Sequence, residues 1–284
     1  MGVEPMELIH SIKELQQKLD RNERAGRTVG LVPTMGFLHE GHLALAKQAK
    51  EQNDTVVMSI FVNPAQFGPG EDFESYPRDM DRDAKLAESA GVDYLFIPSV
   101  EEMYPTDGGI RILPGAQATA LCGASRPGHF DGVLKVVLKL FNIVDPDRSY
   151  FGMKDAQQLA IIETFVRDFN LRTDIVRVPT VREEDGLAKS SRNVNLSETE
   201  RQEAPAIRQA LELGAELFAE GKPAGEIEEK VAAYITGNSS GRIDYVSLLS
   251  YPELTEYDPS SEEAILACAV HFEKTRLIDN IILK

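Results

Sequence analysis

The sequence predicts an α/β protein with a Rossmann-like, doubly wound parallel-sheet domain over residues 1–180 and a smaller α+β domain over residues 181–284. Short apolar runs alternate with helical patterns up to about residue 180, which is typical of a parallel sheet covered by helices. Beyond that point, two helical stretches precede three strand-like runs, which is typical of a small antiparallel sheet. A chain of 284 residues suits two domains of ordinary size.

The first domain begins with a β-loop-α-β pattern. Residues 28–33 (TVGLVP) form a short apolar run that ends at a proline, and residues 55–62 (TVVMSIFV) form a second one. Between them, residues 42–52 carry apolar side chains at helical spacing. Right-handed crossovers make this pattern a parallel strand pair.

Strands and helices continue to alternate through the rest of this domain. Six apolar residues between 133 and 144 recur at helical spacing and predict an amphipathic helix. The remaining predicted helices cover residues 81–90 and 156–169, and the remaining strands cover residues 92–98, 148–151 and 174–180. Residues 1–20 are expected to form an amphipathic helix.

The pattern of the second domain opens with a capping box over residues 197–200 (SETE). We expect one long helix from there to about Glu220 and a second helix after Pro223. Three strand-like runs follow, over residues 243–249, 264–272 and 275–283.

Composition narrows the class of function. The chain has 30 Lys and Arg against 46 Asp and Glu, a formal net charge of −16, which disfavours a nucleic-acid partner. Its two cysteines offer no disulfide framework, which fits a reducing compartment. No window approaches the ~18 consecutive apolar residues of a membrane span. We therefore expect a cytoplasmic protein without a membrane partner.

The loop after the first predicted strand carries the strongest functional pattern. Residues 33–42 read PTMGFLHEGH and place His39 and His42 at the start of the first predicted helix. Gly36 and Gly41 allow the backbone to approach a ligand closely. Strand-to-helix loops of this kind bind phosphates, and two imidazoles there can donate to developing negative charge.

Two other interpretations of this loop fit less well. The Gly36-x4-Gly41 spacing mimics a P-loop, but His42 and Leu43 stand where a P-loop needs Lys and Ser or Thr. A zinc site would need further ligands at motif spacing, and His39 and His42 have none.

The sequence His39-Glu40-Gly41-His42 resembles the HIGH motif of nucleotidyltransferase-type α/β domains. The second motif of that group is a KMSKS-like loop that closes on the triphosphate. Residues 189–192 (KSSR) resemble it and follow the last predicted strand of the α/β domain, after a turn at Asp185-Gly186.

A closer resemblance is to the pantothenate synthetase (pantoate–β-alanine ligase) family. The blocks that carry it appear in family order: PTMGFLHEGH at 33–42, SIFVNPAQFG at 59–68, YPRD at 76–79, RPGHFDGV at 126–133, FGMKDAQQL at 151–159 and DGLAKSSRNVNL at 185–196. The resemblance implies that pantoate and Mg-ATP give a pantoyl adenylate and pyrophosphate. The amine of β-alanine then attacks the adenylate, giving pantothenate and AMP. It also implies a homodimer.

The resemblance also implies nucleotide-binding residues. His42 matches the catalytic histidine, His39 supports the same phosphates, and Lys154 and Arg192 are the other two side chains expected in catalysis. The whole expected ATP site comprises Met35, Gly36, Phe37, Leu38, His39, Glu40, Gly41, His42, Gly152, Met153, Lys154, Asp155, Val181, Lys189, Ser190, Ser191 and Arg192.

The substrate and metal residues follow from the same comparison. Gln66 and Gln158 match the two glutamines that bind pantoate, the first of them beside β-alanine, and Asp83 is expected to hold Mg²⁺ through water. The chain departs from the family at Met153, Ala156 and Lys189, where Glu, Tyr and Met are expected. Lys189 either adds a phosphate contact or extends into solvent while Ser190, Ser191 and Arg192 contact the phosphates, and we expect the second arrangement.

Two alternatives remain open from the sequence. One is another HIGH-group enzyme, such as a cytidylyltransferase or a tRNA ligase, although the net charge of −16 disfavours tRNA. The other is a non-catalytic nucleotide-binding protein on the same fold, which the presence of His42, Lys154 and Arg192 disfavours.

Overall fold

The computed structural model describes residues 5–20, 26–106 and 108–284. Contacts divide the chain into two compact units. The first comprises Met1–Pro114, Pro127–Met153 and Ile162–Pro179, and the second comprises Gly115–Arg126, Lys154–Ile161 and Thr180–Lys284. The domain boundary expected between residues 180 and 181 stays a prediction.

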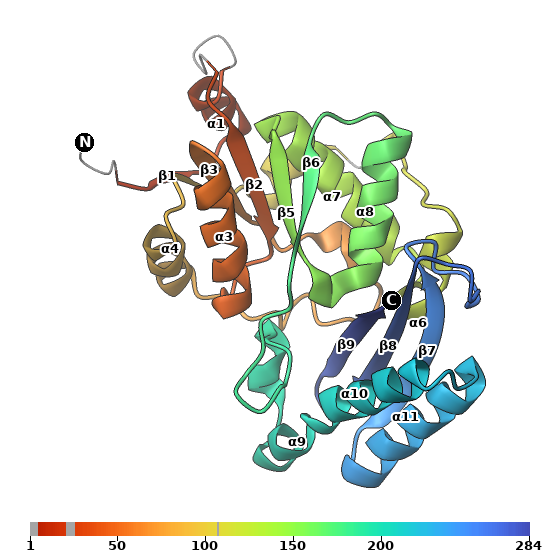
Figure 1. Ribbon diagram of the computed structural model, residues 1–284. Coiled ribbons are helices and arrows are strands. Elements are labelled where there is room, and N and C mark those ends of the chain that lie inside the picture. The colour runs from red at the N-terminus through yellow and green to blue at the C-terminus, as the bar shows by residue number, and fades with distance from the viewer. Residues whose placement is uncertain (1–4, 21–25, 107) are drawn as a thin grey trace. The chain divides into compact units, whose positions relative to one another are not determined.

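The first unit is built on a six-stranded sheet in the order β1-β4-β3-β2-β5-β6, with every pair parallel (Figure 1). The predicted parallel α/β fold is therefore confirmed. The strands are β1 (Glu7–Ile9), β2 (Val29–Thr34), β3 (Thr55–Ile60), β4 (Tyr94–Phe96), β5 (Arg148–Gly152) and β6 (Asp174–Val178).

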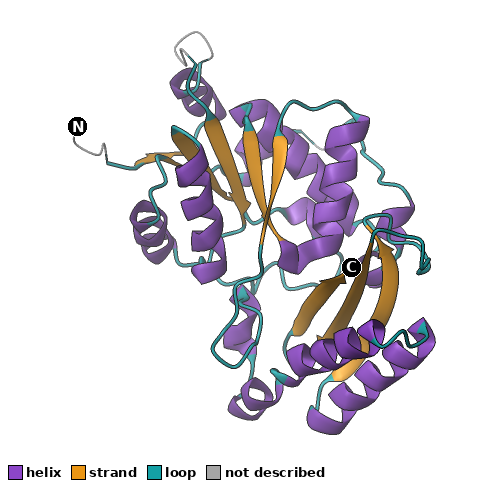
Figure 2. Cartoon of the chain, in the orientation of Figure 1, coloured by secondary structure: helices purple, strands orange, loops and turns teal. Residues whose placement is uncertain are grey.

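Helices cover both faces of this sheet (Figure 2). Because β3 and β4 lie on one side of β2, and β5 and β6 on the other, right-handed crossovers put the connecting helices on opposite faces. The helices are α1 (Ile12–Lys18), α3 (Glu40–Gln52), α4 (Met80–Ser89), α5 (Val100–Met103), α7 (His129–Val144) and α8 (Ala156–Asp168). The division between the two units falls within α8.

Helix α7 confirms the helical spacing seen in the sequence. All six apolar residues of the pattern are buried, at positions 133, 136, 137, 140, 141 and 144. Strands β2 and β3 are buried along most of their length, as expected for central strands of a parallel sheet.

The single helix expected over residues 1–20 is wrong in part. Residues 1–4 lie outside the described residues, and β1 precedes the shorter α1. The Glu7 N–H donates to the Asp93 carbonyl at 2.9 Å, and the Ile97 N–H donates to the Ile9 carbonyl at 2.8 Å. Pairing with the edge of β4 and complete burial of Ile9 outweigh the local helical pattern.

The second unit holds the predicted small antiparallel sheet of three strands, and their order is β7-β8-β9. Its strands are β7 (Arg242–Tyr251), β8 (Glu263–His271) and β9 (Arg276–Leu283). Helices α10 (Ala206–Ala219) and α11 (Ala224–Asn238) share one apolar core with this sheet, which includes Leu211, Val231 and Leu266. Helix α6 (Leu121–Ser125) also belongs to this unit.

The long helix expected from the capping box to Glu220 is wrong, because it is two helices. Helix α9 (Glu198–Glu203) ends before Pro205, and α10 begins after it. Proline lacks the N–H that a continuous helix needs, and its ring collides with the preceding turn. The capping box itself is present, with Ser197 and Glu200 bonded reciprocally.

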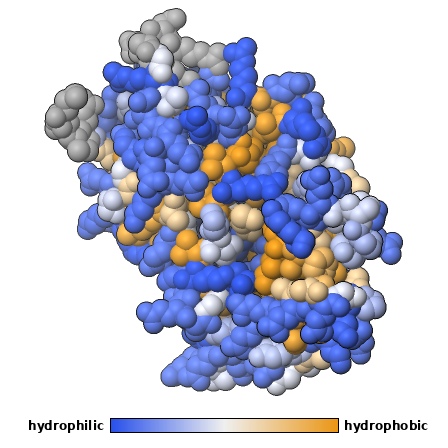
Figure 3. Space-filling model, in the orientation of Figure 1, coloured by the Kyte–Doolittle hydropathy of each residue, from blue (hydrophilic) through white to orange (hydrophobic). Residues whose placement is uncertain are grey.

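None of the described helices combines the length and the apolar character needed to cross a membrane. The face of the molecule in Figure 3 is mostly hydrophilic, as expected for a chain in which 27% of the residues are charged.

Candidate functional site

The strand order of the first sheet reverses between β2 and β5. Ligands of doubly wound sheets bind at such a switch point, outside the carboxyl ends of the strands. The loop of residues 35–39 follows β2. Gly152 is the last residue of β5, and Met153 follows it. The first-unit members of the expected ATP site therefore flank the switch point.

His39 and His42 cap the start of α3 reciprocally. The Gly41 N–H donates to Nδ1 of His39 at 3.1 Å, and the His39 N–H donates to Nδ1 of His42 at 3.3 Å. The ring centroids are 4.0 Å apart. A ring nitrogen that accepts a hydrogen bond carries no proton, so each neutral imidazole carries its proton on Nε2. Both histidines therefore present an Nε2–H donor at a helix N-terminus.

The turn before His39 is held by a carboxylate that sequence reasoning assigned to a metal. Asp83, on α4, accepts the Phe37 N–H at 2.6 Å and the Leu38 N–H at 2.7 Å, and it is only 1% exposed. Burial raises the pKa of Asp83 above its ordinary value, and the backbone N–H groups of Leu38 and Phe37 partly offset this effect.

Gln66 lies in a short 3-10 helix, η1 (Pro64–Gln66), that follows β3. It is 9% exposed, and its Nε2 atom lies 3.2 Å from Sδ of Met35, a weak acceptor in the loop after β2. The structure therefore brings the expected pantoate residue Gln66 next to the expected ATP loop.

Asn63 orients this glutamine, and the sequence analysis did not single it out. Its Nδ2 donates to Oε1 of Gln66 at 3.0 Å, and its Oδ1 accepts the Tyr104 hydroxyl at 2.8 Å. Burial raises the pKa of Tyr104 to about 12, so its hydroxyl keeps its proton and donates. The Asn-Pro dipeptide at 63–64 is a turn signal that could have pointed to Asn63.

Helix α7 packs against η1 at a glycine. A Cβ atom on Gly132 would collide with the Ala65 carbonyl and would lie 2.6 Å from the Gln66 nitrogen. The Gly132 carbonyl also accepts Nδ2 of Asn63 at 3.1 Å, and Nδ1 of His129 lies 2.8 Å from the Gln66 carbonyl. These contacts fix the turn that carries Gln66 against α7.

A mostly apolar cavity of ≈ 250 Å³ adjoins the loop in the first unit. Its lining includes Met35, Phe37, Phe61, Phe73 and Asp83. The loop therefore borders a hollow large enough to admit a small organic group.

The other expected site residues belong to the second unit. They are Lys154, Asp155, Gln158, Val181, Lys189, Ser190, Ser191 and Arg192. Nζ of Lys154 lies 3.6 Å from Oδ2 of Asp155, and the Lys154 carbonyl accepts Nδ2 of Asn280 at 2.9 Å. Strand β9 thereby fixes the backbone of Lys154.

The neighbouring glutamines of α8 have different surroundings. Gln157 is 6% exposed, and its side chain bonds to the Cys122 N–H and to the Gln117 and Ala120 carbonyls. Gln158 is partly exposed, and its side chain makes no hydrogen bond with the described residues. Of the two, Gln158 is the one available to a ligand.

Residues 181–189 form a hairpin that leads into the KSSR segment. The Lys189 N–H donates to the Val181 carbonyl at 2.9 Å, and the Glu183 N–H donates to the Leu187 carbonyl at 2.8 Å. Arg182 makes two contacts with Asp279 on β9, at 2.6 and 3.0 Å. The hairpin is thus fixed to the small sheet.

Lys189 does not extend into solvent, so that expectation is wrong. Its Nζ atom lies 2.7 Å from Oε2 of Glu183, and its side chain is 21% exposed. The hairpin brings the two residues together, because 183 and 189 are diagonal neighbours on one face of the ladder.

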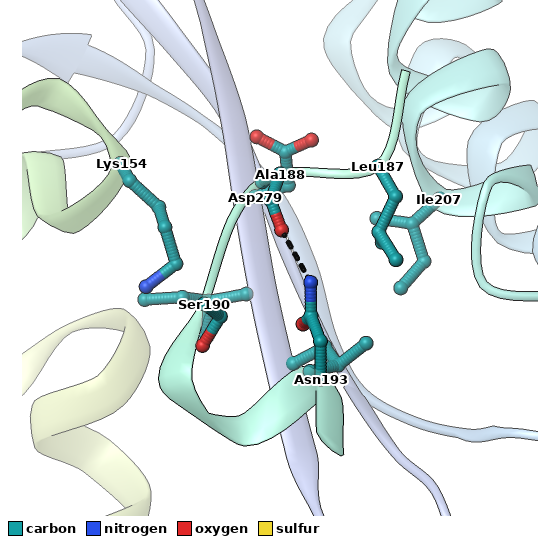
Figure 4. A pocket seen from close by; sticks show the side chains of 9 residues that line it. Lys154, Leu187, Ala188, Ser190, Asn193, Ile207 and Asp279 are labelled. Carbon is teal, nitrogen blue, oxygen red and sulfur yellow. Dashed lines mark hydrogen bonds between the residues drawn. The ribbon is translucent and has the colours of Figure 1, made fainter. Parts of the chain in front are cut away.

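The KSSR segment continues into a 3-10 helix, η4 (Ser191–Asn195), whose N-cap is Ser190. Nδ2 of Asn193 donates to the Ala188 carbonyl at 3.1 Å, as Figure 4 shows. In the same view the Lys154 side chain reaches towards the segment that carries Ser190. Lys154, Ser190 and Asn193 line one small cavity of ≈ 10 Å³, with room for about one water molecule.

No metal cluster is evident in the described part of the chain. Within residues 5–20, 26–106 and 108–284, no three His, Cys, Asp or Glu residues are placed to hold one ion together. Both oxygens of Asp83 already accept backbone N–H groups, so its geometry does not fit a Mg²⁺ ligand well. The metal role of Asp83 stays a prediction.

A family model described as pantoate-beta-alanine ligase matches residues 7–282, nearly the whole chain. The chain belongs to the pantoate–β-alanine ligase family. This membership overturns the alternatives of a cytidylyltransferase and a tRNA ligase.

Curated relatives of the ligase family match this chain over nearly their whole length. The chain is 61% identical over 277 residues to the pantothenate synthetase of Lysinibacillus sphaericus, covering 98% of each chain. It is 54% identical over 278 residues to the pantothenate synthetase of Bacillus subtilis, covering 98% of this chain and 97% of that one.

Solved structures of the ligase family share the fold. Pantothenate synthetase from Thermus thermophilus superposes with a TM-score of 0.92 at 44% identity, covering 97% of this chain and 99% of that one. The ligase from Francisella tularensis, a complex with β-γ ATP and β-alanine, gives a TM-score of 0.81 at 36% identity, covering 98% and 97%.

Proposed function

We propose that this chain makes pantothenate from pantoate, β-alanine and ATP in two steps, through a pantoyl adenylate. The carboxylate of pantoate attacks the α-phosphorus of ATP, the α–β phosphoanhydride bond breaks, and pyrophosphate leaves. The amine of β-alanine then attacks the acyl carbon, loses a proton, and AMP leaves. Adenylation is needed because a bare carboxylate would have to expel oxide.

One observation carries this proposal most directly. In the reciprocal cap at the start of α3, Nδ1 of His39 and Nδ1 of His42 accept backbone N–H groups, next to the switch point of the sheet. This supports neutral imidazoles with the proton on Nε2. Donors that are fixed before the reaction stabilise charge as it develops, at no cost of reorganisation. In the first step that charge develops on the α-phosphate and on the leaving pyrophosphate.

We assign the remaining nucleotide roles from the family resemblance. Lys154 and Arg192 contact phosphate oxygens, and Arg192 offers a planar fork suited to them. Ser190 and Ser191 add hydroxyl donors, and Asp155 takes the ribose. Backbone groups of residues 35–38, 40–41 and 152–153, together with Val181 and Lys189, complete the ATP site.

Gln66 and Gln158 are the proposed pantoate ligands. A neutral amide both donates and accepts, which suits an acid that also carries hydroxyl groups. The partly exposed, unbonded side chain of Gln158 supports its assignment, whereas the bonded Gln157 is a structural residue.

Mg²⁺ is proposed as the companion of ATP. It shields the charge of the triphosphate when bound, and it needs few protein ligands because phosphate oxygens and water supply most of its shell. The described residues offer no cluster that would hold it alone, so no step is assigned to a metal-binding side chain.

Exchange of labelled pyrophosphate into ATP tests the two-step order. Exchange should require pantoate and Mg-ATP but not β-alanine, whereas AMP should accumulate only when all three substrates are present. Exchange that begins only on addition of β-alanine would contradict the adenylate intermediate. Absence of AMP under all conditions would favour the non-catalytic alternative.

A homodimer and a cytoplasmic location are further proposals that come from the family resemblance. Two free, buried cysteines, Cys122 and Cys268, support a reducing compartment. Light scattering of the purified chain would test the dimer, since a monomeric mass at working concentration would contradict it.

A further inference from the structure

The turn that precedes His39 and His42 has two consecutive residues with a positive φ. Gly36 and Phe37 follow each other with φ of +83° and +48°. A non-glycine residue in the left-handed region is uncommon and persists only when the surrounding structure holds it. Leu38, the last residue of this turn, directly precedes the N-cap His39.

Two adjacent residues of α4 hold this turn. Asp83 accepts the N–H of Phe37 at 2.6 Å and that of Leu38 at 2.7 Å, one on each carboxylate oxygen. Arg82 donates from Nη1 to the Leu38 carbonyl at 2.9 Å, and its guanidinium carbon lies 5.3 Å from the centre of the Phe37 ring. Together they contact two amides, a carbonyl and a ring.

The same carboxylate also limits what position 36 can carry. A Cβ atom on Gly36 would lie 3.1 Å from Oδ2 of Asp83 and 2.9 Å from Cγ2 of Ile60. Asp83 therefore packs against Gly36 in addition to accepting hydrogen bonds from the turn. Its 1% exposure means that this arrangement is shielded from solvent.

We propose that Asp83, assisted by Arg82, is the positioning residue of the phosphate-binding loop. It fixes the turn of residues 36–38 and thereby the entry of the chain into α3, where His39 and His42 present their Nε2–H groups. The inference rests on the proposed function of those histidines. It differs from a metal role, because both oxygens of Asp83 bond to backbone amides.

Asp83→Asn is the direct test. The variant keeps the size of the side chain but turns an NH₂ group towards one of the two backbone N–H donors. Asp81→Asn is the matched control, since Asp81 is exposed in the same first turn of α4. We would measure hydrogen exchange of the Phe37 and Leu38 amides, the melting temperature, and pyrophosphate exchange at several Mg²⁺ concentrations.

The expected result for Asp83→Asn is a chain that still folds, with exchange of the two amides about five- to tenfold faster, since one of their acceptors is lost. The kcat of pyrophosphate exchange should fall about 10- to 100-fold, the cost of a misplaced catalytic group. The KM for pantoate and the Mg²⁺ requirement should stay close to those of the wild type. Asp81→Asn should leave all of these unchanged.

Three outcomes would overturn the inference. They are unchanged exchange of both amides in Asp83→Asn, an unchanged kcat, and recovery of the lost rate by excess Mg²⁺, which would make Asp83 a metal ligand. If Asp83→Asn does not fold, Arg82→Met decides instead, because it removes the Leu38 bond, the ring contact and the 3.8 Å ion pair with Asp83 but leaves the carboxylate and its two backbone bonds in place. A kcat for Arg82→Met equal to that of the wild type would overturn the proposal, and a severalfold drop at an unchanged Mg²⁺ requirement would support it.

Amide exchange also separates this inference from the proposed function. Wild-type protein that shows no pantoate-dependent exchange of pyrophosphate would contradict the function. The amide protection of Phe37 and Leu38 would still show whether Asp83 holds the turn.

Discussion

Asn63 donates its side-chain Nδ2–H to Oε1 of Gln66 at 3.0 Å. The direction of this bond is fixed, because the Ala65 backbone N–H, which can only donate, bonds to Oδ1 of Asn63 at 3.2 Å. The side-chain nitrogen of Asn63 must therefore face Gln66, and the side-chain oxygen of Gln66 must accept the hydrogen bond. The Nε2–H₂ group of Gln66 therefore faces the loop after β2, where it lies 3.2 Å from Sδ of Met35, and it is a donor of the kind that suits an anionic acid.

Gln66→Ala should raise the KM for pantoate while kcat and the KM for ATP change less, because ground-state binding is lost. One hydrogen bond to a charged group corresponds to about 10- to 100-fold in affinity. Gln66→Glu should be worse than Gln66→Ala, since it keeps the bond from Asn63 but turns an acceptor towards the substrate. Steady-state kinetics with each substrate varied in turn would measure both variants. A Glu variant that binds pantoate better than the Ala variant would show that the orientation of Gln66 is reversed.

His42→Ala should lower kcat by about 10²- to 10³-fold, or ~2.7–4 kcal/mol, which is the usual effect of removing one donor to developing charge. The chain should still fold, because the cap retains the bond from the Gly41 N–H to His39. His10→Ala serves as a control, since His10 is exposed and bonds to the Ile97 carbonyl at 2.8 Å. Near wild-type turnover of a folded His42→Ala protein would remove His42 from the mechanism.

Lys189→Met should change kcat/KM for ATP by less than about tenfold, under ~1.4 kcal/mol. The ammonium group already pairs with Glu183 at 2.7 Å, so a phosphate would have to compete with that carboxylate. Arg192→Ala should lower kcat/KM for ATP clearly more, because a planar guanidinium can bind two phosphate oxygens at once. Both variants should be assayed at low and high salt. A greater loss at Lys189 than at Arg192 would place the phosphate contact on the lysine.

Glu200 gives the second unit a pH-dependent stability. It accepts the Glu273 N–H and the Ser197 N–H, each at 2.8 Å. These bonds hold the pKa of Glu200 below its ordinary 4.5, and the Glu273 N–H has the larger effect on that pKa. A lowered folded-state pKa means that the stabilisation is present above the unfolded-state value and is lost as the pH falls through the folded-state value.

Glu200→Gln should therefore unfold at a lower denaturant concentration than the wild type at about pH 7, and the difference should shrink below about pH 4. Glu198→Gln, an exposed change in the same turn, should follow the wild type at every pH. Urea unfolding from neutral to acid pH would measure this. A difference that stays constant across that range would contradict an effect of ionisation.

The parallel sheet and most of its helices could be predicted, because each of these elements has an apolar pattern of its own that extends over several consecutive residues. Strand β3 is a continuous apolar run, and α7 repeats its apolar face over four turns. Strand β1 could not be found in this way, because three residues carry little pattern and their pairing with β4 is set by distant backbone groups. The break between α9 and α10 is predictable from the sequence, because Pro205 cannot lie inside a continuous helix.

The candidate site divides in the same manner. Motif spacing located His39 and His42, and the family resemblance located Gln66. The roles of all three residues stay proposals. Spacing could not show that Asp83 faces the backbone of the turn at 36–38, because that contact joins residues about 45 positions apart. Nor could it show the pairing of Lys189 with Glu183, which depends on the register of the hairpin.

The absence of a side chain at position 132 restricts how this enzyme could be redesigned for other hydroxy acids. Any larger residue there would push α7 away from the Ala65 carbonyl and release the turn of residues 63–66. The turn of residues 63–66 and α7 therefore depend on each other at this position, and a side chain at 132 should disturb both. Selection for a new acid would act sooner on Met35, whose thioether lies 3.2 Å from the Gln66 amide and belongs to a side chain rather than to the backbone of the turn.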